Sequence, residues 1–350
     1  MLNGLISNRK RHRPRWHDKA LQLAINGLKS LRNMNCSTLW SFEDGMIISA
    51  VMMVSVAARK IVKITCNIAK IGLAFAGFLI AISASSQAHE FWIEPSSFQP
   101  KSNQTLTADL LIGTDFLGTS AIYVPDQIEA FALLRPTIND KPDDRLERQE
   151  ISGRYGDRPA GKINSGAAGL GIILHQTAPI RMVYLSPTKF DDFAREKGFD
   201  QAFEQHQSLG FSLDKITERY QRFAKSLINV GGAGTAGAGN DRHLGLAIEL
   251  VAEANPYQLP PLEMMPIRLY AGGKPLANAQ ITVFTRHNPR HVETAKYKTD
   301  QEGRARFALL AGRDYLVDSV ILRPLRGADA GDEMWESLWA SLTFHVPTQK

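Results

Sequence analysis

Among the residues whose chemistry could define a function, His89 has the most favourable position in the sequence. It directly follows Ser86-Gln87-Ala88, a small-residue segment that fits a signal-peptidase cleavage site. Cleavage after Ala88 would leave His89 with both a free α-amine and an imidazole. This pair of nitrogens can chelate one divalent ion, and it suits copper, nickel or zinc. A histidine that only caps an edge strand is the competing interpretation.

A metal ion held by His89 would need further ligands. Glu94 is close in sequence, but strand alternation places it on the other face of the expected strand. His243 follows Asp241 and Arg242 at an expected strand entrance, and it could reach His89 only through folding. We predict His243 as the distant partner, so the candidate metal ligands are His89, His243 and Glu94.

Other possible chemistry is less well supported. His287 and His291 have the spacing H-x-x-x-H, but Pro289 between them disrupts the helix that would bring both imidazoles together. The chain has no G-x-S-x-G or H-E-x-x-H motif, and its cysteines, Cys36 and Cys66, precede the expected cleavage site. We therefore expect a protein that is not an enzyme, while a hydrolase site assembled by folding would leave no local pattern.

An export signal is predicted before His89. Residues 71–82 are apolar, and basic residues precede them at positions 59, 60, 63 and 70. A stable membrane span needs about 20 apolar residues, so this shorter run predicts a cleaved signal peptide at residues 46–88 and a periplasmic mature protein. An uncleaved membrane anchor is the alternative. Residues 1–45 fit no signal peptide, and we expect them to be an untranslated or disordered extension.

The net charge depends on the same cleavage. The full chain has 41 Lys and Arg against 35 Asp and Glu, but its first 88 residues hold 12 basic and 3 acidic side chains. The mature part would keep 29 basic and 32 acidic residues, so a nucleic acid is not an expected partner. It would also lack cysteine, which excludes disulfides, thiolate metal ligands and a lipid anchor on the N-terminus.

The mature chain predicts a mainly β fold with two β-sandwich domains, immunoglobulin-like or transthyretin-like. Residues 89–258 form the expected N-terminal domain, and residues 259–350 form the second, after a proline-rich junction that cannot sit inside a sheet. In the segment HEFWIEP, alternation places Phe91 on one strand face and Trp92 on the other.

A helical insertion is predicted at residues 188–230 of the first domain, followed by a glycine-rich loop at residues 231–240. Its longest helix is inferred from apolar residues spaced three and four apart, behind an N-cap at Ser212. These apolar residues are Leu213, Ile216, Tyr220, Phe223 and Leu227. A shorter helical pair is predicted before this helix, with Phe190, Phe193 and Phe203 as apolar contacts and Gly198 as a stop.

The chain resembles the bacterial family called domain of unknown function 4198 through HEFWIEPSSFQP, RYQRFAKSLINVG, LGLAIELVAEANPYQL and WESLWASLTF, in this order. Its C-terminal part is similar to transthyretin-like and carboxypeptidase-regulatory-like sandwiches through LANAQITV and TDQEGRARF. Some relatives in the family look like periplasmic partners of nickel or cobalt uptake systems. The resemblance implies a nickel or cobalt ion as cargo and a metal-uptake permease or outer-membrane receptor as partner.

A second function stays open on the sequence alone, namely a non-catalytic module that recognises a protein or a glycan. Trp335 and Trp339 are four residues apart on an expected helical turn, and their rings could stack on a sugar. Aromatic pairs at this spacing more often belong to a core.

Overall fold

The computed structural model describes residues 89–135, 146–232, 239–288, 291–326 and 331–348. The predicted signal peptide and the N-terminal extension lie outside these residues, as does most of the glycine-rich loop. Within the described ranges, no helix combines the length and the apolar character needed to cross a membrane.

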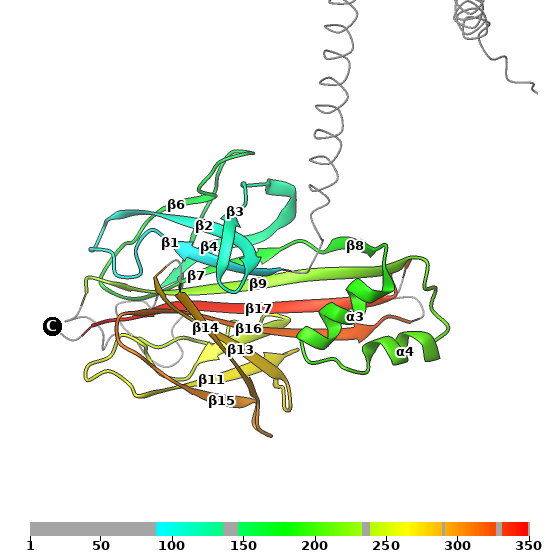
Figure 1. Cartoon of the computed structure of the whole chain (residues 1–350). Helices are drawn as coiled ribbons and strands as arrows, with labels where there is room; N and C mark the ends of the chain where they lie inside the picture. The colour runs from blue at the N-terminus through cyan, green and yellow to red at the C-terminus, as the bar shows by residue number, and fades with distance from the viewer. Residues whose placement is uncertain (1–88, 136–145, 233–238, 289–290, 327–330, 349–350) are drawn as a thin grey trace, which may run out of the picture. The chain divides into compact units, whose positions relative to one another are not determined.

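The expected mainly β fold is confirmed (Figure 1). The first strands of the described chain are β1 (Glu90–Pro95), β2 (Thr105–Thr114), β3 (Leu117–Ser120), β4 (Ile128–Arg135), β5 (Glu147–Glu150), β6 (Gly161–Asn164), β7 (Gly169–Thr177) and β8 (Ile180–Tyr184). A 3-10 turn, η1 (Pro125–Gln127), precedes β4. Two helices follow, α3 (Pro187–Glu196) and α4 (Ala202–Ser208). The remaining strands are β9 (Ile216–Val230), β10 (Ile248–Ala252), β11 (Met264–Ala271), β12 (Lys274–Pro275), β13 (Gln280–Asn288), β14 (His291–Lys298), β15 (Arg304–Ala308), β16 (Arg313–Pro324) and β17 (Trp335–Val346).

A large central sheet runs through the described residues in the order β14-β13-β16-β17-β9-β7-β4-β5, with β8 paired to β9 as its ninth strand. Its pairs are antiparallel except β17 with β9, which run parallel. One four-stranded sheet (β1, β2, β3, β6) packs on one face, and another (β10, β11, β12, β15) packs on the other face (Figure 1). The described part of the chain from residue 89 onward is therefore a stack of sandwich-like layers around one shared sheet.

Alternate side chains of β9 show that the central sheet packs against both outer sheets. Ala224 and Ile228 belong to the apolar cluster that contains Phe91 of β1. Phe223 and Leu227 point the other way, into the cluster that contains the β10 and β11 side chains. Because successive residues of a strand point to opposite faces, β9 is buried on both sides.

The predicted long helix over residues 212–230 is wrong, because β9 is a 15-residue strand there. Ile216 and Tyr220 pack against the helices, whereas Phe223 and Leu227 face the opposite layer. A strand covered on both faces carries apolar residues at even and odd positions, and their combined spacing imitates a helix. The shorter helical pair is confirmed as α3 and α4, and Gly198 ends α3 with a φ of +88°.

The structure does not confirm two separate domains divided at residue 259. Strand β10 lies before this position and pairs with β11 after it, and β9 pairs with β17. The proline-rich segment is the connection between β10 and β11. It interrupts the sheet ladder, as prolines do, without ending the folded unit.

Candidate functional site

His89 and His243 lie on opposite faces of the central sheet. The carbonyl oxygen of His89 accepts a 3.4 Å hydrogen bond from Arg222, whose guanidinium lies over the Phe91 ring on the β1 side. His243 lies on the β10 side, where it stacks on Tyr270 with a centroid distance of 4.2 Å. The structure therefore does not bring these two predicted ligands together.

Glu94, the third predicted ligand, is engaged in an ion pair. Both of its oxygens accept from Arg286, at 3.0 and 2.8 Å, and the Trp92 indole N–H donates to it at 3.2 Å. Arg286 also contacts Asp314, which pairs with His345 at 2.7 Å. In the described part of the chain, no group of three or more His, Cys, Asp or Glu side chains has an arrangement that could hold a metal ion.

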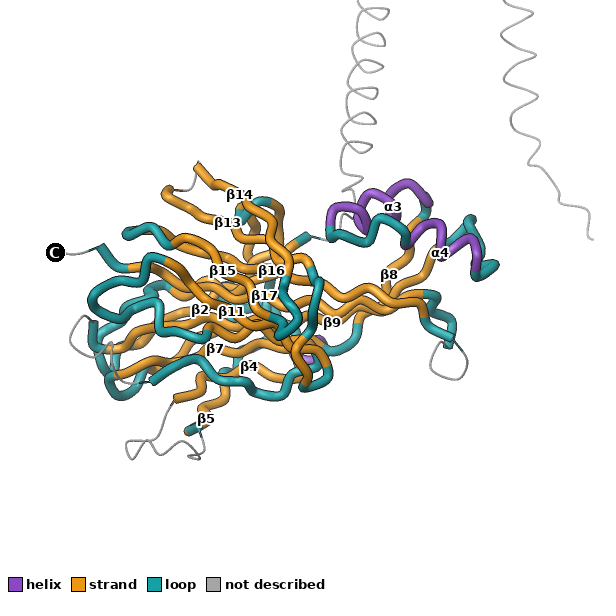
Figure 2. The backbone as a smooth tube through the Cα atoms, turned by 90° about the horizontal axis from the view of Figure 1, so that it is seen from below, coloured by secondary structure: helices purple, strands orange, loops and turns teal. Residues whose placement is uncertain are grey.

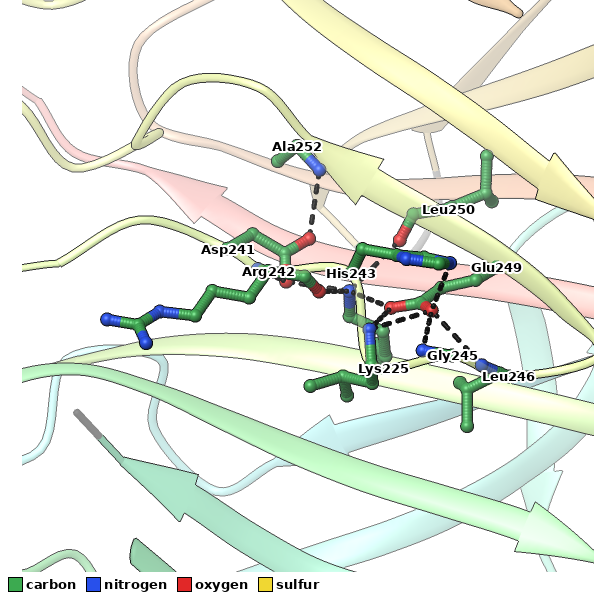
Figure 3. Close-up of polar contacts among 10 residues, drawn as sticks. Lys225, Asp241, Arg242, His243, Gly245, Leu246, Glu249, Leu250 and Ala252 are labelled. Carbon is green, nitrogen blue, oxygen red and sulfur yellow. Dashed lines mark hydrogen bonds and ion pairs between the residues drawn. The ribbon is translucent and has the colours of Figure 1, made fainter. Parts of the chain in front are cut away.

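His243 belongs to a closed polar network around the buried Lys225 (Figure 3). The Lys225 ammonium contacts Asp241 at 2.7 Å and Glu249 at 3.0 Å. Glu249 also accepts hydrogen bonds from the backbone N–H groups of Leu244, Gly245 and Leu246. Burial raises the pKa of Asp241, while Lys225 opposes the shift. The Asp241 and Glu249 carboxylates are both bound to Lys225 or to backbone N–H groups. We therefore interpret this network as structural, holding the loop that carries His243 in place.

A second network lies where β1 begins, and we call it the β1 cluster: Glu90, Lys197, Arg222, Asp318 and, beside them, His89. Lys197 directly follows α3, and its ammonium contacts Glu90 at 2.5 Å and Asp318 at 3.3 Å. These three residues are only 2–5 % exposed. A charge this deep in the protein is tolerated when it has partners of opposite sign.

The protonation of the β1 cluster is shifted by its surroundings. Burial raises the pKa of Glu90 to about 7, against the attraction of Lys197 and with a further contribution from Asp318. Burial likewise raises the pKa of Asp318. Burial alone would lower the pKa of Lys197, but Asp318 and Glu90 outweigh it and raise this pKa above its ordinary value. One lysine thus holds two carboxyl groups that repel each other.

Arg222 enters the β1 cluster from β9 without a direct carboxylate partner. Its guanidinium lies 4.9 Å from the Tyr220 ring centroid and 5.4 Å from that of Phe91. The guanidinium donates to the carbonyl oxygen of His89 at 3.4 Å, and among the described residues its buried Nε atom has no hydrogen-bond partner. Burial lowers the pKa of Arg222, and Tyr220, followed by Asp318 and Glu218, opposes this shift.

Several buried polar atoms around the β1 cluster lack a hydrogen-bond partner in the described chain. Besides Arg222 Nε, they are Nδ1 of His89, Oε2 of Glu90, Oγ of Ser341 and both ring nitrogens of His175. His175 lies between the rings of Phe91 and Phe131, and burial, followed by Arg222, lowers its pKa to about 3. Buried polar atoms usually bind water, an ion or a ligand when no protein group satisfies them. The β1 cluster is therefore the candidate functional site.

Sheet register explains why these distant residues meet. His175 of β7 lies opposite Ala224 of β9, which lies opposite Ser341 of β17, and Ser341 lies opposite Asp318 of β16. They form one row across the central sheet, beneath β1. No local spacing in the sequence reveals such a row, so the sequence analysis did not predict His175 and Asp318 as site residues. Lys197, which follows α3, was not predicted either. The one available signal was a charged or polar residue inside an otherwise apolar strand.

Trp335 and Trp339 are core residues on strand β17 rather than on the expected helical turn. They are 1 % and 3 % exposed. Their indole N–H groups donate to Nδ1 of His206 at 3.0 Å and to Oγ of Ser337 at 2.8 Å. Neither ring forms an exposed platform on which a sugar could stack.

These layers and the buried β1 cluster define a β-sandwich module. The profile of the family "Domain of unknown function (DUF4198)" matches residues 86–321, and the chain belongs to this family. No curated protein matches the chain.

Solved structures give only remote similarities. The D0-D1 domain of intimin shares 13 % identity with a TM-score of 0.17, over 73 % of this chain and 97 % of that one. Salmonella alpha-2-macroglobulin appears as the mutant Y1175G and as the form reacted with methylamine, at 12 % and 11 % identity and a TM-score of 0.18. Both matches cover 73 % of this chain but only 15 % of the macroglobulin chain.

Proposed function

We propose that this chain is an exported, periplasmic binding protein in which the N-terminal His89 carries a divalent transition-metal ion. Nickel or cobalt is the favoured cargo from the family resemblance, with copper and zinc as the alternatives by ligand type. The observation that supports the proposal best is the free Nδ1 atom of His89. Nδ1 is the ring nitrogen nearest the backbone, so it closes a six-membered chelate ring with the α-amine of the same residue.

The surroundings of His89 favour a weakly held, exchangeable ion. Glu94 is bound to Arg286 and His243 lies on the other face of the sheet, so neither completes the coordination. Arg222, whose guanidinium contacts the His89 carbonyl oxygen, adds a positive charge that opposes a bound cation. An ion held by two nitrogens and water can pass to a protein that offers more ligands. A metal-uptake permease or an outer-membrane receptor is the corresponding partner.

Calorimetric titration with Ni(II) and Cu(II) tests the proposal on two forms of the mature protein. The first begins at His89 with a free α-amine, verified by mass spectrometry, and the second is the same chain acetylated at that amine. Acetylation removes the α-amine from the chelate and leaves the imidazole, so we expect an affinity at least about tenfold lower. The variant His243→Ala, which begins at His89, is the matched control and should bind as the unaltered protein does. Equal affinity of the two N-terminal forms would rule out the proposal.

A further inference from the structure

Three arginines gather on the outer face of the sheet that contains β10, β11, β12 and β15. This sheet lies below the central sheet in Figure 1, and Figure 2 views the chain from that side. Ile267 of β11 and Ala305 of β15 lie opposite each other and point inward to the apolar core. Because side chains alternate along a strand, Arg268 of β11 and Arg304 and Arg306 of β15 point outward. We call the surface that these three residues form the arginine face.

The arginine face carries more positive charge than its own carboxylates pair. Arg268 and Arg304 lie directly opposite each other in the β11–β15 ladder, where like charges destabilise a sheet. Glu253 lies between them, with its two oxygens 3.1 Å from Nε of Arg268 and 2.7 Å from Nε of Arg304. Arg306 is exposed two residues beyond Arg304, and no ion pair joins it to another residue in the described ranges. Two guanidinium groups thus share one carboxylate, and the third is unpaired.

A second carboxylate, that of Asp300, lies in the turn before β15 and attracts Arg268 from a distance. Its Oδ1 atom already accepts hydrogen bonds from the backbone N–H groups of Glu302 and Arg304, at 3.0 and 2.8 Å. Asp300 therefore holds the turn, and it forms no ion pair with the arginine face. Three guanidinium charges remain against the carboxylates of Glu253 and Asp300, so the face attracts anions.

The spacing of the arginines favours an extended polypeptide as the anion. Arg304 and Arg306 are two residues apart on one strand, so their Cα atoms are about 7 Å apart. Alternate side chains of an extended segment have the same spacing, and a guanidinium group can bind a carboxylate through two parallel hydrogen bonds. The ring of Tyr270, beside Arg268, is already stacked on His243 at a centroid distance of 4.2 Å. This stacking disfavours a sugar ring as the ligand.

We propose that the arginine face docks an extended acidic segment of a partner protein. Carboxylates at alternate positions of the segment pair with Arg304 and Arg306, and the charge of Arg268 adds to the attraction. Exposed ion pairs are individually weak, so the contact is transient and sensitive to salt. The arginine face and the proposed metal site at His89 share no residue, so either proposal can fail without the other.

Titration of the mature protein into a fluorescein-labelled peptide of alternating glutamate and serine tests this inference, with fluorescence anisotropy as the readout. We expect saturable binding at low salt that weakens as the salt concentration rises. Arg306→Gln should lower the affinity about three- to fivefold, because it removes one exposed ion pair. Glu253→Gln removes the competing carboxylate and should raise the affinity by a similar factor. Arg154→Gln is the matched control, because Arg154 is an exposed arginine between β5 and β6.

Three results would overturn the inference. The first is no saturable binding of the peptide. The second is an equal loss of affinity in Arg306→Gln and Arg154→Gln, which would show a response to net charge alone. The third is tighter binding of phosphatidylglycerol vesicles than of the peptide at the same concentration of negative charge, which would assign the face to a membrane surface. Arg306 is exposed, so its substitution should leave the fold intact, and a gain of affinity in Glu253→Gln cannot come from unfolding.

Discussion

Lys197 and Glu90 form a buried ion pair of 2.5 Å between residues that are 107 positions apart. The pair joins the end of α3 to the start of β1, and Asp318 of β16 completes it. Three segments that are distant in the sequence are thus fastened at one point. A buried ion pair of this kind favours one packing of the sheets over others, even where its net contribution to the free energy of unfolding is small.

Replacing Lys197 by methionine should destabilise the protein by about 3–5 kcal/mol at pH 7, because Glu90 and Asp318 would remain buried without a cation. Urea unfolding measures the loss. The double variant Glu90→Gln/Lys197→Met removes one of the two stranded charges and should recover part of this stability. A single variant as stable as the unaltered protein would mean that the two carboxyl groups are already neutral.

The stability of the fold should depend on pH through Glu90. Its pKa is about 7 in the folded protein against an ordinary 4.5, so the folded state binds a proton that the unfolded state has released. The contribution is fully present below about pH 4.5 and is lost as the pH rises through about 7. The difference in unfolding free energy between Glu90→Gln and the unaltered protein should therefore change across this window by on the order of 2 kcal/mol. A difference that stays constant with pH would contradict the assignment.

Replacing Arg222 by methionine should strengthen metal binding at His89. The guanidinium contacts the His89 carbonyl oxygen, and removing its charge should raise the affinity for Ni(II) by about three- to tenfold at low salt. Arg219→Met is the control on the same strand, since Arg219 pairs with Glu336 instead. Calorimetry on both variants would distinguish the two residues, and an equal response would show a general effect of net charge.

The Lys225 network should hold the loop at residues 241–246 in place. Glu249→Gln weakens the ion pair to Lys225 and the hydrogen bonds from three backbone N–H groups. We expect hydrogen exchange of these backbone amides to become at least about tenfold faster. Glu253→Gln is the comparison, because Glu253 pairs with Arg268 and Arg304 in a more exposed ion pair. If both variants exchange alike, the network does not hold the loop.

The local pattern predicted the β1 strand correctly. In HEFWIEP, Phe91 and Ile93 enter one apolar cluster and Trp92 enters another, as the alternation indicated. The pattern failed for β9, where both faces are buried and the apolar residues no longer follow a period of two. An alternation of apolar and polar residues reveals a strand only when one of its faces is exposed. A strand buried on both faces shows no such alternation.

The sequence by itself determined the mainly β character, the two short helices and the family, because these depend on residues close together in the chain. Only the tertiary structure decided that β9 and β17 pair across the expected domain boundary. The same pairing places His89 and His243 on opposite faces and brings Lys197 to Glu90 and Asp318. These contacts depend on strand order and register, which arise when distant segments bury their apolar faces against one another.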